Sequence, residues 1–200
     1  INALVFVTQS LLPLEAKQWV MENMSLNFWA GGTFKGYQLL TYMFMHANLS
    51  HLFFNMFALW MFGRILEYDF GSRRFLVYYL VCGVGAGLIQ LGVNWIEYAS
   101  LLNQGYAPSM IPTMSTVGAS GAIFGVLLAY GMIHPNNMIM LIFPPIALKA
   151  KWFVIAYGVL ELLAGISGSG SNVAHYAHLG GMLWGFLLLL YWKKRGKIYY

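Results

Sequence analysis

Charged residues are scarce in this chain. Only 8% of its 200 residues are Asp, Glu, Lys or Arg, whereas 60% are hydrophobic. An ordinary soluble domain carries about 25% charged residues, so the composition excludes the usual soluble enzyme or binding domain. It predicts an integral membrane protein whose surface contacts the lipid bilayer.

Cysteine and acidic residues are rare as well. Cys82 is the single cysteine, so a disulfide within the chain is excluded, and we expect Cys82 to be a packing residue. Eleven basic against six acidic residues give a formal charge of +5. The basic residues are not gathered on one face, which argues against a nucleic-acid partner.

Long apolar runs are what the sequence does have. Five segments are long enough, or nearly so, to cross a hydrocarbon core of about 30 Å: residues 49–66, 75–95, 117–133, 152–166 and 176–192. A sixth run, residues 1–12, is too short, and because it begins with Ile1 and stops at Pro13 we expect a first spanning helix truncated at its start. The pattern predicts an all-α membrane protein with six transmembrane helices, forming a single domain over residues 1–200.

The basic residues orient these helices. Nine of the eleven lie in alternate connections or in the C-terminal tail: Arg64, Arg73, Arg74, Lys149, Lys151, Lys193, Lys194, Arg195 and Lys197. The positive-inside rule places those connections in the cytoplasm, together with both termini. The second, fourth and sixth helices therefore run from the outer face inward.

Four polar residues stand near the outer ends of these three helices. His51 and Asn55 are four residues apart on the second helix and share one face. Ser120 begins the fourth helix, and His178 lies near the start of the sixth. Polar groups at membrane depth are costly and usually functional, so we expect these four to meet in one external layer.

Glycine spacing predicts a close approach of the fourth and sixth helices. Gly121 and Gly125 follow Ser120, and Gly181 and Gly185 follow His178. Such small-xxx-small pairs let helix backbones come nearly into contact. The serine and the histidine can then come within hydrogen-bond reach.

At these residues the sequence resembles the rhomboid family of intramembrane serine proteases, from Tyr37 to the end. Three motifs carry the resemblance: His46-x4-His51-x3-Asn55, Gly118-x-Ser120-Gly121 and Ala177-His178-x2-Gly181-x3-Gly185. The resemblance implies a six-helix bundle with a Ser-His dyad and no cofactor. It also implies that the substrates are single-pass membrane proteins, cut near the outer end of their helix after a small residue.

The resemblance also implies a role for each site residue. Ser120 matches the nucleophile and His178 the general base, whereas His51 and Asn55 match the side chains that stabilise the oxyanion. Phe124 stands where the family often has a tyrosine stacked on the catalytic ring.

Several further residues are expected to pack against the catalytic residues without contacting the substrate. His46, Gly118, Gly121 and Gly181 belong to this group, and Glu67 matches an acidic residue that we take as structural. The first external connection departs from the family, because Tyr37-Gln38 replaces the Trp-Arg pair of many members.

Glu161 and His175 remain open. Glu161 is the only carboxylate inside a predicted span that could orient a histidine, and we favour a structural pairing with a neighbouring helix. His175 could line the cavity, or could form a metal site with His46 and His178. We expect no metal, because no inward-facing carboxylate or cysteine completes that set.

Three connections are expected to matter for access or to lie at the interface. Residues 167–172, rich in Gly and Ser, are predicted to form a flexible cap that moves with the fifth helix. The external segment 94–116, with Pro108 and Pro112, is predicted to shape the same rim. Residues 138–145 are either an interfacial segment or a helix end.

The sequence favours a protease of the bacterial inner membrane with its active site facing the external or periplasmic side. Two alternatives stay open: a non-catalytic rhomboid-like escort of membrane proteins, and a small ion transporter. The escort should lack the serine or the histidine, and transporters are usually built from internal repeats, of which none is visible here. The physiological substrate, the organism, the oligomeric state and any cytoplasmic extension before Ile1 are not encoded in recognisable form.

Overall fold

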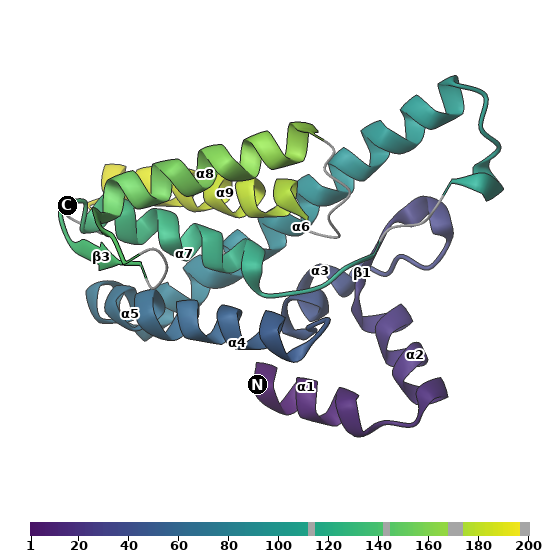
Figure 1. Cartoon of the computed structure of the whole chain (residues 1–200), viewed down its shortest axis with the longest axis horizontal. Helices are drawn as coiled ribbons and strands as arrows, with labels where there is room; N and C mark the ends of the chain where they lie inside the picture. The colour runs from purple at the N-terminus through teal and green to yellow at the C-terminus, as the bar shows by residue number, and fades with distance from the viewer. Residues whose placement is uncertain (112–114, 142–144, 168–173, 197–200) are drawn as a thin grey trace.

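Long helices surround one central helix in the computed structural model, and two short strand pairs lie at the ends of this bundle (Figure 1). The structure describes residues 1–111, 115–141, 145–167 and 174–196. Over these residues the protein is predominantly helical, as the sequence predicts.

The N-terminal part contains short elements. Helix α1 (Asn2–Leu11) has 10 residues, which corresponds to about 15 Å and is too short to cross a membrane. It ends where Leu12 takes the extended conformation favoured before a proline, and α2 (Leu14–Met24) runs in a new direction. The next elements are β1 (Leu26–Asn27), η1 (Trp29–Gly31), α3 (Gln38–Thr41) and η2 (Tyr42–Phe44).

The first long apolar helix is continuous from Leu49 to Phe70. It consists of α4 (Leu49–Ala58), the π-helical turn η3 (Leu59–Gly63) and α5 (Arg64–Phe70). Asn48 caps its start, because the side-chain oxygen of Asn48 accepts the main-chain N–H of His51. The predicted start at residue 49 is thus confirmed, and the helix ends four residues later than predicted.

Helix α6 (Ser72–Asn103) is longer than predicted and has 32 residues. The span was predicted to end at residue 95, whereas residues 94–103 of the predicted external segment 94–116 continue the helix. The physical reason is that the sequence contains no Gly or Pro between Gly92 and Gly105. Helix η4 (Pro108–Met110) follows, and Pro112 lies outside the described residues.

Strand β2 (Ser115–Thr116) returns the chain to the bundle. It pairs antiparallel with β1, with Leu26 opposite Thr116. This pair ties the N-terminal part to the segment that leads into α7. Two-residue strands carry no alternating pattern, which is why an all-α fold was predicted.

Helix α7 (Ser120–Ile133) is the central helix. Ten of its 14 residues are buried, and it contacts α4, α6, α8 and α9. A helix that is apolar on every side is expected to be buried in this way. The helix starts at Ser120, three residues after the predicted start of the span.

A second strand pair follows α7. Strands β3 (Met138–Met140) and β4 (Ala147–Lys149) are antiparallel, with Ile139 opposite Leu148. Residues 138–140 therefore form a strand and not a helix end, and residues 142–144 lie outside the described residues.

Helices α8 (Ala150–Ser167) and α9 (His175–Lys194) complete the bundle. Helices α6, α7 and α9 pack against one another, and α8 lies against α7 and α9 (Figure 1). The outer side of α8 exposes large apolar side chains such as Trp152, Leu160 and Ile166. An apolar surface of this kind suits lipid rather than water.

Three of the described helices are long and apolar enough to cross a membrane. They are Leu49–Phe70, Ser72–Asn103 and Ala150–Ser167. The predicted cap 167–172 starts at the last residue of α8, and its residues 168–172 lie outside the described part of the chain.

Candidate active site

Gly118 allows the segment before α7 to approach His51. Its φ of +124° is a conformation that L side chains rarely adopt, and its N–H donates to the carbonyl of Tyr42 at 2.9 Å. A Cβ at this position would lie 2.7 Å from both Cε1 and Nε2 of the His51 ring. Only glycine therefore lets this segment place Ser120 beside α4.

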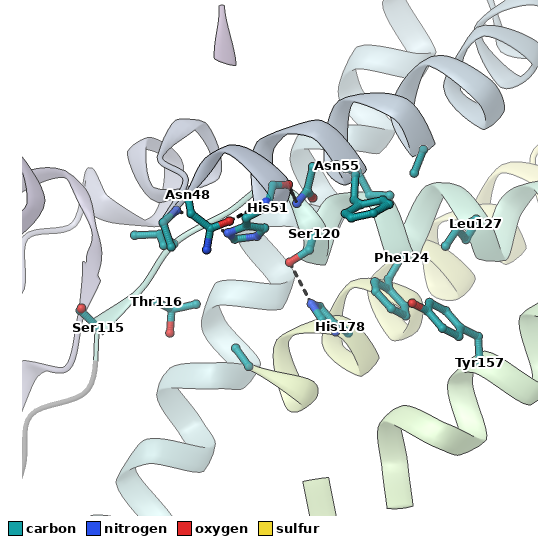
Figure 2. Close-up of a pocket in the computed structure, with 16 residues that line it drawn as sticks. Asn48, His51, Asn55, Ser115, Thr116, Ser120, Phe124, Leu127, Tyr157 and His178 are labelled. Atoms are coloured by element: carbon teal, nitrogen blue, oxygen red, sulfur yellow. Dashed lines mark hydrogen bonds between the residues drawn. The ribbon is translucent and has the colours of Figure 1, made fainter. Parts of the chain in front are cut away.

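The hydroxyl of Ser120 and the ring of His178 form a hydrogen bond. Ser120 is the first residue of α7, and its Oγ lies 2.8 Å from Nε2 of His178, which is in the first turn of α9 (Figure 2). The His178 side chain is 9% exposed. Two residues 58 positions apart in sequence thus meet in a largely buried place.

The starts of α7 and α9 meet because their backbones are in contact. A Cβ on Gly181 would collide with the carbonyl group of Gly121, and a Cβ on Gly125 would lie 2.9 Å from the carbonyl oxygen of Gly181. The fourth glycine, Gly185, faces Tyr78 of α6 instead. Three of the four glycines for which a helix contact was predicted therefore lie between α7 and α9, and the fourth, Gly185, lets α6 approach α9.

Stacked rings fix the plane of the His178 imidazole. Phe124, one turn after Ser120, stacks on His178 with a centroid distance of 4.1 Å and an interplanar angle of 6°. Tyr157 of α8 stacks on the other face of Phe124 at 5.2 Å and 3°. Tyr157 was not anticipated from the sequence, where one tyrosine in an apolar helix carries no distinguishing signal.

His51 and Asn55 face the same space from α4 (Figure 2). Nδ1 of His51 accepts the N–H of Ala47 at 3.4 Å, so in the neutral ring Nε2 carries the hydrogen. Asn55 Nδ2 donates one hydrogen to the carbonyl of His51 at 2.7 Å and keeps a second one. Both side chains can therefore donate a hydrogen bond to an oxygen atom in the cavity.

His46 supports the His51 ring from behind. It is completely buried, and its ring meets His51 edge-on with a centroid distance of 5.1 Å. Burial, and secondarily the neighbouring His51, lowers the pKa of His46 from 6.5 to about 4. His46 is therefore a neutral, tightly packed ring near pH 7.

A cavity of about 580 Å³ joins these groups. Figure 2 shows its walls, which include Asn48, Asn55, Ser115, Thr116, Ser120 and His178. The serine lies between the ring of His178 and the two donors of α4. This arrangement is what acyl transfer requires, namely a nucleophile bonded to a base with donors nearby for a developing negative charge.

Glu161 brings a carboxylate to the far edge of the His178 ring. Its Oε2 lies 2.8 Å from Nδ1 of His178 and 2.7 Å from Nδ1 of His175. The expectation that no inward-facing carboxylate stands beside these histidines was wrong, whereas the expected pairing of Glu161 with a neighbouring helix is observed. Candidate metal-ligand atoms of Glu161, His175 and His178 all lie within 4.8 Å of one another, and His46 is not part of this group.

The Tyr37-Gln38 pair, at which the sequence departs from the rhomboid pattern, consists of one exposed and one buried residue. Gln38 is buried, and its Oε1 accepts the N–H groups of Asn27 and Lys35 at 3.3 and 3.2 Å. The neighbouring Tyr37 is 47% exposed. Glu67 is exposed in α5, and its carbonyl accepts the N–H of Gly71.

Comparison with known proteins identifies relatives. The family model of the Rhomboid domain matches residues 33–195. The chain is 31% identical over 160 residues to Rhomboid-like protein 11, chloroplastic, of Arabidopsis thaliana (76% of this chain, 51% of the relative) and 30% identical over 190 residues to RHOMBOID-like protein 12, mitochondrial, of the same plant (90% and 52%). It is 33% identical over 155 residues to Rhomboid protease GluP of Bacillus subtilis (75% and 25%). These alignments cover about half of each plant relative and a quarter of GluP.

Proposed function

The chain belongs to the rhomboid family, and from this premise we propose that it is an intramembrane serine endopeptidase. Family membership and the apolar helices make it an integral membrane protein. The single observation that carries the proposal is the hydrogen bond of 2.8 Å between Ser120 Oγ and His178 Nε2 at the wall of the cavity.

In the proposed first step Ser120 attacks the scissile carbonyl carbon of a substrate. A serine hydroxyl is a poor nucleophile, so its proton passes to Nε2 of His178 as the Oγ–C bond forms. The protonated ring then donates that proton to the leaving amine as the C–N bond breaks. The products of this step are a free N-terminal amine and an acyl-enzyme ester on Ser120.

The negative charge that develops on the carbonyl oxygen needs donors that are already in place. The N–H of Ser120 is one of the first-turn donors of α7 without an intrahelical partner, and the positive end of the helix dipole lies there. Nε2 of His51 and the second amide hydrogen of Asn55 supply the other donors. In the second half of the reaction water attacks the ester, and His178 again takes up and returns a proton.

The expected membrane arrangement is a bundle of six helices. We assign five of them to the continuous helix α4 to α5, α6, α7, α8 and α9, and α1, which is too short to cross a membrane, to part of the first. In Figure 1, α5, the start of α8 and the C-terminus lie toward one end of the bundle. Basic residues are found at or next to these segments: Arg64 begins α5, Arg73 lies in the first turn of α6 directly after α5, Lys149 directly precedes α8, and Lys193 lies in the last turn of α9. The site at the starts of α4, α7 and α9 would then face the external or periplasmic side of a bacterial inner membrane, and relatives named chloroplastic and mitochondrial make an organellar membrane the alternative.

The expected substrates are single-pass membrane proteins, as the family resemblance implies. The peptide bonds of a transmembrane helix are hidden in its hydrogen-bonded turns, so the substrate must unwind near its outer end before Ser120 can reach a carbonyl. GluP is named a protease, which supports this class of activity.

A non-catalytic escort of membrane proteins is the second candidate, and a small ion transporter is the third. The escort is disfavoured by the presence of both Ser120 and His178 in hydrogen-bond contact. A transporter is disfavoured by the family match.

Labelling of the purified protein with a fluorescent fluorophosphonate distinguishes the protease from the other two candidates. We expect wild type to be labelled and Ser120→Ala to be unlabelled, because the probe forms a covalent bond only with an activated serine. Ser50→Ala is the matched control, because Ser50 is an exposed serine of α4. An unlabelled wild type that is folded would contradict the proposal.

A further inference from the structure

Glu161 of α8 is bonded to the side of His178 that faces away from Ser120. Its Oε2 is 2.8 Å from Nδ1 of His178, whereas Nε2 of the same ring is 2.8 Å from Ser120 Oγ. The three side chains therefore form a continuous chain of two hydrogen bonds across helices α8, α9 and α7. Neither of these bonds depends on a neighbour in sequence, since the residues lie 17 and 58 positions apart.

We propose, on the basis of the protease function proposed above, that Glu161 is a positioning residue that completes a Ser-His-Glu triad. A carboxylate can only accept hydrogen bonds, so Nδ1 of His178 must carry the ring hydrogen. In the neutral ring the other nitrogen, Nε2, then holds a lone pair directed at the Ser120 hydroxyl. Glu161 thus selects the one tautomer in which His178 can act as a base.

The three hydrogen-bonded side chains are largely buried, which strengthens the effect of the Glu161 charge on His178. The Glu161 side chain is 11% exposed, and that of His178 is 9% exposed. When His178 takes the Ser120 proton it becomes positively charged, and a carboxylate at hydrogen-bond distance stabilises that charge best where water is excluded. The proton moves from Ser120 Oγ to His178 Nε2 only, and Glu161 takes up none.

Helix α8 holds His178 from a second direction as well. Tyr157 is one turn before Glu161 on the same face of α8. It stacks on Phe124, which stacks on His178. One helix therefore fixes both the hydrogen bond at the ring edge and the plane of the ring, which is the geometry a positioning role requires.

His175 is a second donor to the same carboxylate. Its Nδ1 lies 2.7 Å from Oε2 of Glu161, and its side chain is 16% exposed. It occupies one turn of α9 with His178 and holds the carboxylate from the more exposed side. We therefore expect His175→Gln to have a smaller effect than any loss of the Glu161 carboxylate.

The test compares Glu161→Gln, Glu161→Asp and the control Glu97→Gln, an exposed glutamate of α6, with wild type in detergent. For cleavage of a transmembrane reporter we expect Glu161→Gln to lower kcat roughly 10- to 100-fold with KM nearly unchanged, less than the ~10⁴-fold of an Asp→Asn change in a Ser-His-Asp protease. Glu161→Asp should recover part of the lost kcat, and Glu97→Gln should match wild type.

A second measurement does not depend on cleavage. Nitrogen-15 NMR of protein labelled at histidine reports which ring nitrogen of His178 carries the hydrogen, with His178→Asn used to assign the signal. We expect the hydrogen on Nδ1 in wild type and a mixture of tautomers in Glu161→Gln. A folded scaffold with a merely structural glutamate would show the same tautomer in both proteins.

The outcomes separate this inference from the proposed function. If wild type is labelled at Ser120, and Glu161→Gln retains the wild-type kcat and the wild-type tautomer of His178, the triad proposal is wrong and the protease proposal stands. If wild type shows the hydrogen of His178 on Nε2, the triad is wrong even where Glu161→Gln fails to fold. If a chelator abolishes activity and zinc restores it, Glu161 serves as a metal ligand and the positioning role is overturned.

Discussion

The imidazole of His178 lies flat against the ring of Phe124, with centroids 4.1 Å apart and planes inclined by 6°. This stack holds the imidazole edge toward Ser120 on one side and toward Glu161 on the other. The geometry of the proposed base therefore depends on a residue that makes no hydrogen bond to substrate or base.

Phe124→Leu should lower kcat without abolishing activity. Leucine fills much of the volume but offers no flat face, so we expect a loss of roughly 10- to 100-fold from a less well-oriented base. The control is Phe186→Leu, an exposed phenylalanine of α9, which should match wild type. Equal kcat values for wild type and Phe124→Leu would show that the stack does not orient His178.

Gly118→Ala should abolish most of the activity. The new Cβ would lie 2.7 Å from the His51 ring, so the ring or the α7 start must move. Gly105→Ala is a matched control, because Gly105 also has a positive φ, of +90°, but its Cβ would meet nothing within 4 Å. Both variants carry backbone strain of ~1–3 kcal/mol; only Gly118→Ala should lose labelling, and equal labelling of the two would contradict the role given to Gly118.

Asn55→Ala should slow cleavage and leave fluorophosphonate labelling detectable. Loss of one oxyanion donor costs about 10²- to 10³-fold in kcat in a water-soluble serine protease, and His51 and the Ser120 N–H remain. Asn103→Ala, at the exposed end of α6, should behave as wild type. Single-turnover cleavage measures the effect directly, and an unchanged rate would remove Asn55 from the oxyanion site.

Acid should destabilise the protein through His46. In the folded protein the pKa of His46 is lowered from 6.5 to about 4, so between these pH values the unfolded chain binds a proton that the folded protein excludes. Stability contributed by the neutral ring is complete above pH 6.5 and is lost as the pH falls toward about 4. The thermal unfolding temperature in detergent should fall as the pH is lowered through this window in wild type, and less steeply in His46→Leu. Identical slopes of unfolding temperature against pH in the two proteins would contradict the prediction.

Much of the fold could be predicted from hydropathy, because each long helix appears in the sequence as an apolar run. The residues at which the helices end were less predictable. Helix α6 continues to Asn103 because nothing after Trp95 breaks a helix, although hydropathy falls there. Strands β1 to β4 are two or three residues long and leave no periodic signal.

The candidate site could be predicted as far as its motifs extend. Ser120 and His178 were placed together by helix direction and glycine spacing, and their side chains are 2.8 Å apart. The contribution of α8 was predicted only in part: Glu161 was recognised as the one carboxylate in a span that could orient a histidine but was interpreted as a structural pairing, and Tyr157 was not anticipated. Glu161 in particular looks like any buried acid until its two histidine partners are known.

The most direct test is cleavage in a membrane. Wild type and Ser120→Ala, reconstituted in liposomes with a single-pass reporter protein, are compared by mass spectrometry of the products. We predict that wild type makes one cut near the outer end of the reporter helix and that Ser120→Ala makes none. Cleavage by Ser120→Ala at the wild-type rate, or no cleavage by folded wild type of any of a panel of single-pass reporters, would contradict the account.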